Sequence, residues 1–268
     1  MSKIHDYILS KNNNGEKVLS VFLTSGYPAK ESFAQLAVNV LKAGADMLEI
    51  GFPFSDPLAD GPIIQASSLA ALENKINLEE TLKYVREIKA IASSDPETNS
   101  KPVILMGYAN PVLNYGLDKF AKEAKSSGVD GIIIPDVPVE EYDNFYTAEF
   151  MGIDVILLVT PTTSNERIKQ IDKKSQGFVY CVSVSGTTGN FDRKSTDNLA
   201  FVKKCYENIL VNKMLVGFGI SKPEDARQYA EYCDGVIVGS AVIKSLGNDS
   251  TDYKNTLELV KSLKAPLK

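Results

Sequence analysis

Histidine is almost absent from this chain of 268 residues: His5 is the only one. A single chain therefore cannot build a zinc or iron centre from several histidines. A serine or cysteine nucleophile activated by histidine would have to depend on His5 alone. We expect His5 at the surface, in the first turn of an N-terminal helix. Any enzymatic proton transfer then falls to Asp, Glu, Lys, Tyr or Cys side chains.

The chain also lacks a dense basic run and a long apolar segment. Its 29 Lys and Arg residues stand against 34 Asp and Glu residues, and this net charge of −5 predicts no general affinity for nucleic acid or anionic membranes. The longest aliphatic run, residues 155–159, is too short to span a bilayer, and residues 1–17 lack the apolar core of a signal peptide. Cys181, Cys205 and Cys233 show no paired spacing, so we expect reduced, buried thiols and a cytoplasmic protein.

Short segments rich in Val, Ile and Leu recur along the chain and alternate with amphipathic segments. The aliphatic segments predict buried strands over residues 18–24, 47–51, 102–108, 131–135, 154–160, 178–183, 214–218 and 235–238. The amphipathic segments predict helices over residues 32–43, 78–92, 117–125, 139–151, 165–173, 197–209, 223–232 and 252–263. Such alternation predicts parallel strands joined by crossover helices.

Eight strand–helix units favour one α/β domain over residues 1–268, a single (β/α)8 TIM barrel with extra short helices. An open doubly wound sheet is the alternative, although its G-x-G-x-x-G motif is missing after the first predicted strand. Barrel active sites lie at the carboxyl ends of the strands, so candidate residues are sought there.

Glu49 is an unusual residue for the predicted strand over residues 47–51. Side chains alternate along a strand, so Met47, Glu49 and Gly51 should face the barrel interior while Leu48 and Ile50 face the helices. Burial should raise the pKa of the Glu49 carboxyl group, which suits a general acid or base. A carboxylate satisfied by local hydrogen bonds is the alternative.

Two aspartates, Asp56 and Asp60, follow on a loop stiffened by several prolines. Two carboxylates near one strand end form a candidate pair for acid–base chemistry. Asp60 also stands just before a predicted helix start at Gly61 and Pro62, so helix capping is its alternative role.

Glycines gather after the last three predicted strands, in residues 183–189, in residues 217–219 and at Gly239 before Ser240. Backbone N–H groups at such positions can bind a phosphate, and barrels often bind phosphate near their last two strands. Turn formation alone is the alternative. The polar stretch 187–196 suits either a lid over a ligand or a surface loop.

Other phosphate-binding barrels fit this chain poorly. A Schiff-base aldolase needs a lysine at a strand end, and metal-dependent aldolases and epimerases usually use histidines. Neither requirement is met at the predicted strand ends. The residues favour a carboxylate-driven, metal-free reaction on a phosphorylated substrate.

Several segments of the sequence together resemble a known family. Residues 48–61, LEIGFPFSDPLADG, are similar to the signature of tryptophan synthase alpha subunits. Further segments of the same resemblance are residues 22–28, 108–111, 134–138, 185–189, 217–220 and 238–240.

The resemblance implies a barrel lyase that cleaves indole-3-glycerol phosphate to indole and D-glyceraldehyde 3-phosphate. It implies Glu49 as the acid–base catalyst and Asp60 as the hydrogen-bond partner of the indole N–H group. It implies phosphate binding at Gly189, Gly219, Gly239 and Ser240, and a substrate pocket at Phe22, Tyr108, Ile133, Val159, Tyr180, Thr188, Phe218 and Ile237.

The resemblance also implies a partner. Indole would pass to a tryptophan synthase beta subunit for condensation with L-serine to L-tryptophan, in an α2β2 tetramer. Asp56, Asn110 and Pro138 would face that subunit, which holds the pyridoxal phosphate, and this chain would carry no cofactor or metal. A stand-alone lyase and a non-catalytic phosphate-binding barrel are the alternatives.

Overall fold

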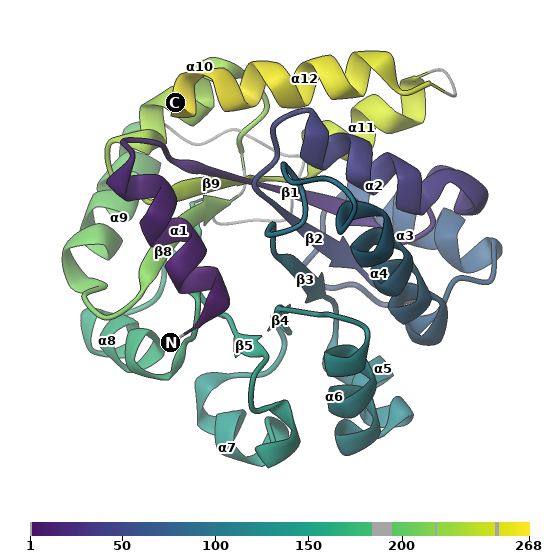
Figure 1. The fold of residues 1–268 in the computed structure, drawn as a ribbon. Coiled ribbons are helices and arrows are strands. Elements are labelled where there is room, and N and C mark those ends of the chain that lie inside the picture. The colour runs from purple at the N-terminus through teal and green to yellow at the C-terminus, as the bar shows by residue number, and fades with distance from the viewer. Residues whose placement is uncertain (1, 184–194, 218, 250–251) are drawn as a thin grey trace.

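The strands of the computed structural model form one parallel sheet at the centre of the molecule (Figure 1). The structure describes residues 2–183, 195–217, 219–249 and 252–268. Its strands are β1 (Val18–Thr24), β2 (Met47–Gly51), β3 (Val103–Met106), β4 (Gly131–Ile133), β5 (Asp154–Val155), β6 (Leu157–Val159), β7 (Phe178–Val182), β8 (Lys213–Gly217) and β9 (Gly235–Val238). In this described part the order is β5-β4-β3-β2-β1-β9-β8-β7-β6.

The two ends of this sheet meet in one short segment, residues 154–159. Ile156 separates β5 from β6, yet its N–H group donates to the carbonyl of Ile132 on β4 at 2.9 Å. The following residue, Leu157, is in register with Val179 on β7. The segment therefore bridges β4 and β7 and joins the sheet into a barrel, which confirms the predicted fold class.

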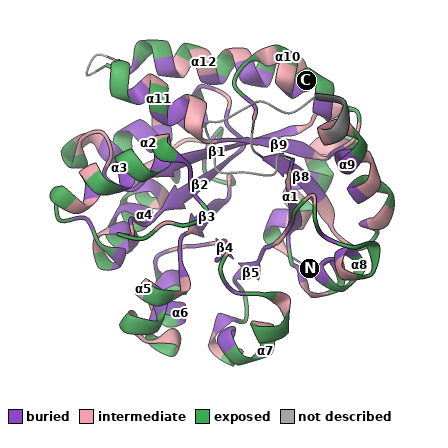
Figure 2. Cartoon of the chain, turned by 180° about the vertical axis from the view of Figure 1, so that it is seen from behind, coloured by how far each residue is buried: buried purple, intermediate pink, exposed green. Residues whose placement is uncertain are grey.

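Helices surround the strands and turn their exposed sides outward (Figure 2). They are α1 (Lys3–Asn13), α2 (Phe33–Lys42), α3 (Pro62–Glu73), α4 (Leu78–Ala92), α5 (Ala109–Tyr115), α6 (Leu117–Ser126), α7 (Tyr142–Phe145), α8 (Asn165–Lys174), α9 (Ser195–Asn208), α10 (Pro223–Ala230), α11 (Ser240–Asn248) and α12 (Lys254–Lys264). Four 3-10 turns accompany them in the described residues: η1 (Lys30–Ser32), η2 (Val139–Glu141), η3 (Ala148–Phe150) and η4 (Ala265–Leu267).

Two predicted elements differ from the structure. The helix expected over residues 139–151 is divided into η2, α7 and η3, because Tyr146 leaves the helical region with a ψ of 86°. The strand expected over residues 154–160 is interrupted at Ile156. Neither difference moves a strand end away from the carboxyl rim of the barrel.

The alternation of side chains along the strands separates two apolar cores. Leu48 and Ile50 on β2 belong to the outer core between strands and helices. Met47 belongs to the inner core, with residues such as Ile104 and Ile237. The predicted orientation of the β2 side chains is therefore confirmed. Glu49 faces the inner side of the barrel, whereas its chain neighbours Leu48 and Ile50 face the helices.

Helix α1 covers the amino end of the barrel. Its buried residues Ile4 and Ile8 belong to the inner core with Val18 and Phe178, the first residues of β1 and β7. The Ser2 side chain caps the helix by accepting a hydrogen bond from the N–H group of His5 at 3.0 Å. Since this end is filled with side chains, any ligand must enter from the carboxyl end.

Three further sequence predictions concern the whole chain. The cysteines are free and buried, as predicted. No helix among the described residues is long and apolar enough to cross a membrane. The assignment of residues 1–268 to one domain stays a prediction.

Candidate active site

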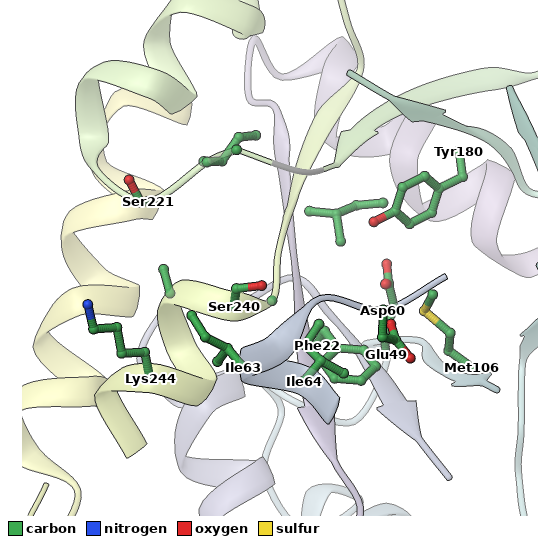
Figure 3. A pocket seen from close by; sticks show the side chains of 15 residues that line it. Phe22, Glu49, Asp60, Ile63, Ile64, Met106, Tyr180, Ser221, Ser240 and Lys244 are labelled. Atoms are coloured by element: carbon green, nitrogen blue, oxygen red, sulfur yellow. The ribbon is translucent and has the colours of Figure 1, made fainter. Parts of the chain in front are cut away.

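A cavity of about 280 Å³ opens at the carboxyl end of the barrel (Figure 3). Apolar side chains provide most of its wall, and its charged side chains lie at opposite ends. In Figure 3 Glu49 and Asp60 lie on one side, near Met106 and Tyr180, whereas Lys244 lies on the other. The described residues that line the cavity are Phe22, Glu49, Asp60, Ile63, Ile64, Met106, Tyr180, Gly219, Ile220, Ser221, Ile237, Gly239, Ser240, Ala241 and Lys244.

The Glu49 carboxyl group is completely buried yet lines this cavity. Its Oε1 atom accepts a hydrogen bond from Ser20 Oγ at 2.8 Å, and its Oε2 atom has no partner among the described residues. Burial raises the pKa of Glu49 from 4.5 to about 8, although the Ser20 hydrogen bond lowers it in part. At neutral pH the group is therefore mostly protonated and can act as an acid.

Asp60 supplies the second carboxyl group. Its Oδ2 atom accepts a hydrogen bond from Tyr108 Oη at 2.9 Å, and Tyr108 Oη in turn accepts one from the N–H group of Ala59 at 3.0 Å. Burial raises the pKa of Asp60 to about 6, against the lowering effect of the Tyr108 hydrogen bond. At neutral pH Asp60 is mostly ionised, so the two carboxyl groups differ in protonation state.

The side chain of Asp60 does not cap helix α3. Gly61 is the N-cap residue of that helix, and it makes no side-chain cap hydrogen bond. Only the backbone carbonyl of Asp60 takes part nearby, accepting a hydrogen bond from the Gln65 side chain at 2.8 Å. The capping alternative is therefore wrong, and the carboxyl group of Asp60 is left for Tyr108 and the cavity.

Two glycines at strand ends leave room for aromatic rings beside the carboxyl groups. A methyl group on Gly51 would lie 2.4 Å from Cζ of Phe22, and one on Gly217 would lie 2.2 Å from Oη of Tyr180. Both rings line the cavity. A side chain at either glycine would therefore overlap an aromatic ring of the cavity wall and force that ring to move.

The opposite end of the cavity is built from β8, β9 and the helix that follows. Gly219 comes after β8, while Gly239 is the N-cap residue of α11 and Ser240 begins it. The first N–H groups of a helix have no partner within the helix and favour an anion. Lys244 lies one helical turn further along α11 and adds a positive charge to this end.

The structure brings most of the predicted site residues together. Glu49, Asp60, Phe22, Tyr180, Ile237, Gly219, Gly239 and Ser240 line the same cavity. Tyr108 reaches Asp60 through its hydroxyl group. Thr188, Gly189 and Phe218 lie outside the described residues.

Three of the predicted pocket residues that the structure describes do not line this cavity, and one of them is Tyr108, which contacts the lining residue Asp60. Ile133 lies in the inner core of the barrel. Val159 belongs to the outer core, because the alternation along residues 154–159 turns Ile156 inward and Val159 toward the helices.

Several functional candidates were not predicted from the sequence. Lys244 could have been found, since it follows Ser240 by four residues, the spacing of one helical turn. Ser20 could have been found by alternation, because it shares the inward face of β1 with Phe22. Ile63, Ile64 and Met106 carry no sequence signal beyond their apolar character.

The residues predicted to contact a partner are exposed and lie in the segments that follow three neighbouring strands. Asp56 follows β2, Asn110 is on α5 after β3, and Pro138 follows β4. These three strands are adjacent in the sheet, so their carboxyl ends share one sector of the rim. In the same loop as Asp56, Leu58 is 86% exposed.

In the described ranges, no group of three or more His, Cys, Asp or Glu side chains could hold a metal ion. His5 lies in the first turn of α1, as predicted, at the closed amino end of the barrel. The carboxyl groups among the described lining residues of the cavity are those of Glu49 and Asp60.

Comparison with known proteins gives consistent matches. A model of the family "Tryptophan synthase alpha chain" matches residues 9–268. The tryptophan synthase alpha chain of Petrotoga mobilis is 41% identical over 269 residues, covering 100% of this chain and 99% of the relative. The crystal structure of tryptophan synthase subunit alpha from Legionella pneumophila superposes with a TM-score of 0.85 and 36% identity, covering 100% of this chain and 98% of that one. A chain of Mycobacterium tuberculosis tryptophan synthase gives a TM-score of 0.88 and 31% identity, covering 99% and 98%.

Proposed function

Because this chain belongs to the tryptophan synthase alpha chain family, we propose that its cavity is where indole-3-glycerol phosphate is cleaved to indole and D-glyceraldehyde 3-phosphate. One observation supports this assignment above the others. Glu49 Oε2 is buried without a hydrogen-bond partner in the described residues, and its carboxyl group lines the cavity that Asp60 also lines. A buried polar atom without a partner is costly, and a substrate group can supply the missing partner.

Glu49 is the acid and then the base of the proposed reaction. Cleavage of the bond between indole C3 and the glycerol chain needs an electron sink, and protonation of C3 creates one within the substrate. The raised pKa of Glu49, about 8, leaves the proton available for this step at neutral pH. The resulting carboxylate can then take the proton of the glycerol hydroxyl group as the carbon–carbon bond breaks.

Asp60 stabilises the positive charge that C3 protonation places on the indole ring. Its pKa of about 6 keeps the carboxyl group ionised at neutral pH, so it can accept a hydrogen bond from the indole N–H group. Tyr108 fixes Oδ2 of Asp60 at 2.9 Å. The two carboxyl groups thus take different roles because their surroundings set different pKa values.

The phosphate group of the substrate binds at the other end of the cavity. Gly219, Gly239 and Ser240 offer backbone N–H groups there. Gly189, which lies outside the described residues, is a further proposed phosphate-binding residue on the basis of the family resemblance. Lys244 is the only Lys, Arg or His among the described lining residues. Because an anion is attracted to Lys244 and repelled by ionised Asp60, the charges orient the substrate with its indole ring toward Glu49.

A beta subunit that carries pyridoxal phosphate is the partner of alpha chains in this family. We propose an α2β2 assembly in which indole passes to that subunit for condensation with L-serine. The exposed residues Asp56, Asn110 and Pro138, with Leu58 beside them, form the proposed contact surface. A cytoplasmic location stays a prediction.

The test is an assay of indole release from indole-3-glycerol phosphate with the purified chain. Glu49→Gln should abolish indole release, since an amide cannot donate an acidic proton, while glycerol 3-phosphate should still bind at the other end. Glu73→Gln, at an exposed position near the end of α3, is the matched control and should keep full activity. Normal turnover in Glu49→Gln would refute the assignment.

The same assay, run with and without a beta subunit, tests the partner. The proposed assembly predicts a marked increase in turnover when the beta subunit is added. Charge reversal at the exposed rim, Asp56→Lys, should weaken that increase and leave the basal rate of the isolated chain unchanged. Full turnover by the isolated chain, with no response to the beta subunit, would favour a stand-alone lyase.

A further inference from the structure

Ser20 is a hydroxyl residue in the inner layer of the barrel, where its neighbours are apolar. It lies in the middle of β1 and is completely buried. The register places Ser20 beside Met47 and Phe22 beside Glu49. Ser20 therefore lies one inward-facing position closer to the amino end of the barrel than Glu49. Ser20 is not among the residues that line the cavity.

The Ser20 hydroxyl group contacts one oxygen of the Glu49 carboxyl group and leaves the other free. Its Oγ atom donates to Oε1 at 2.8 Å, and both residues are completely buried. Oε2 has no partner among the described residues. The contact therefore holds the carboxyl group of Glu49 from the amino-end side of the barrel, and it makes the two carboxyl oxygens inequivalent.

We propose that Ser20 is the positioning residue of Glu49: its hydroxyl group keeps Oε1 as an acceptor, so that the acid proton resides on Oε2 and is presented to the substrate. This inference rests on the proposed function, since it assigns a role within that reaction. Ser20 touches no substrate atom and acts only through Glu49.

Two physical consequences follow from this arrangement. A hydroxyl donor binds a carboxylate more strongly than a neutral carboxyl group, so Ser20 lowers the pKa of Glu49 and limits the effect of burial. It also restricts rotation of the carboxyl group, which aligns the proton with its acceptor. A serine that only filled space in the inner layer of the barrel would affect neither the pKa of Glu49 nor the alignment of its proton.

The other titratable side chains among the described lining residues are Asp60 and Tyr180, which lie near Glu49, and Lys244, which lies across the cavity (Figure 3). Burial, and then the charges of Glu49 and Asp60, raise the pKa of Tyr180 well above its usual value, so this phenol stays neutral. Asp60, with a pKa of about 6, ionises before Glu49. The alkaline limb of the pH profile therefore reports Glu49, and the acid limb reports Asp60.

The experiment compares wild type, Ser20→Ala, Ser20→Thr and Ser20→Cys in the indole-release assay from pH 5 to 10. For Ser20→Ala we expect the alkaline limb of kcat/KM to move up by about one pH unit, because the carboxylate loses its donor. We expect kcat at the plateau to fall about tenfold, with KM unchanged. Ser20→Thr keeps a hydroxyl group, so its alkaline limb should lie at the wild-type pH. Ser20→Cys should shift the alkaline limb by less than Ser20→Ala does. Ser175→Ala removes another buried hydroxyl group, at the amino end of the barrel, and should change neither limb.

Each outcome decides one question. If the wild type releases no indole, the proposed function fails. If the wild type is active and the alkaline limb of Ser20→Ala stays in place, Ser20 has only a structural role and this inference is refuted. If circular dichroism shows that Ser20→Ala does not fold, the test uses Ser20→Cys. An alkaline limb of Ser20→Cys at the wild-type pH then refutes the inference.

Discussion

Replacing Tyr108 by phenylalanine removes one hydroxyl group from the second carboxyl site and leaves the ring in place. In the native chain that hydroxyl group donates to Asp60 Oδ2 at 2.9 Å and accepts from the N–H group of Ala59 at 3.0 Å. The Tyr108 hydrogen bond lowers the pKa of Asp60, whereas burial raises it. Phenylalanine leaves only the effect of burial, so the pKa of Asp60 must rise.

The size of this rise follows from the hydrogen bond. A bond to a charged acceptor contributes about 1.5–3 kcal/mol and is roughly twice as strong as its neutral counterpart. The difference between the two protonation states is therefore about 1–1.5 kcal/mol, which is about one pH unit. The pKa of Asp60 should move from about 6 to about 7. The ionised fraction then falls about fivefold at pH 6, and from about nine-tenths to about half at pH 7.

The assay is kcat/KM for indole release between pH 5 and 10. The acid limb should move up by about one unit in Tyr108→Phe, because ionised Asp60 is the active form, while the alkaline limb of Glu49 stays near pH 8. Tyr115→Phe removes a hydroxyl group that contacts Glu123, outside the cavity, and should leave both limbs unchanged. A loss of activity by the same factor at every pH would refute the reasoning, since Tyr108 would then act by position alone.

Two other predictions test parts of the chain that lie away from the carboxyl pair. Lys244→Gln should raise KM several-fold at unchanged kcat and weaken the dependence of KM on ionic strength. The control Lys261→Gln, on the exposed side of α12, should change neither. Equal KM values for Lys244→Gln and the wild type would show that Lys244 does not belong to the phosphate site. Lys264→Met should lower the free energy of unfolding, measured in urea, by about 3 kcal/mol, because it leaves Asp46 buried without the ammonium group that now lies 2.8 Å away. A decrease in the free energy of unfolding below about 1 kcal/mol would show that other donors suffice for Asp46.

The sequence was sufficient to predict features that depend on local pattern. Alternation along residues 47–51 predicted that Glu49 faces inward, because a carboxylate between Leu48 and Ile50 can only lie on the opposite face of the strand. The order of aliphatic and amphipathic segments predicted the barrel. Both depend on periodicity, which one chain displays without any tertiary information.

Features that depend on contacts between distant segments could not be predicted in the same way. The break at Ile156 arises because residues 154–159 pair with β4 on one side and β7 on the other, a condition that closure of the barrel imposes. The contact of Asp60 with Tyr108 joins residues 48 positions apart, whereas the local pattern left a helix cap open as the alternative role of Asp60. Proline and glycine beside an aspartate indicate a turn, but they do not show where the carboxyl group points.

The distribution of charge explains how one cavity can hold an acid and an anion site together. Burial raises the pKa of Glu49 to about 8, and the neutral hydroxyl group of Ser20, its hydrogen-bond donor among the described residues, lowers it only in part. A lysine beside it would favour the carboxylate, lower its pKa and remove the acid proton at neutral pH. The positive charge of Lys244 instead lies across the cavity (Figure 3), on the helix whose amino end is proposed to hold the phosphate. Moving a lysine next to Glu49, for example by Met106→Lys, should therefore shift the alkaline limb downward even if the phosphate still binds.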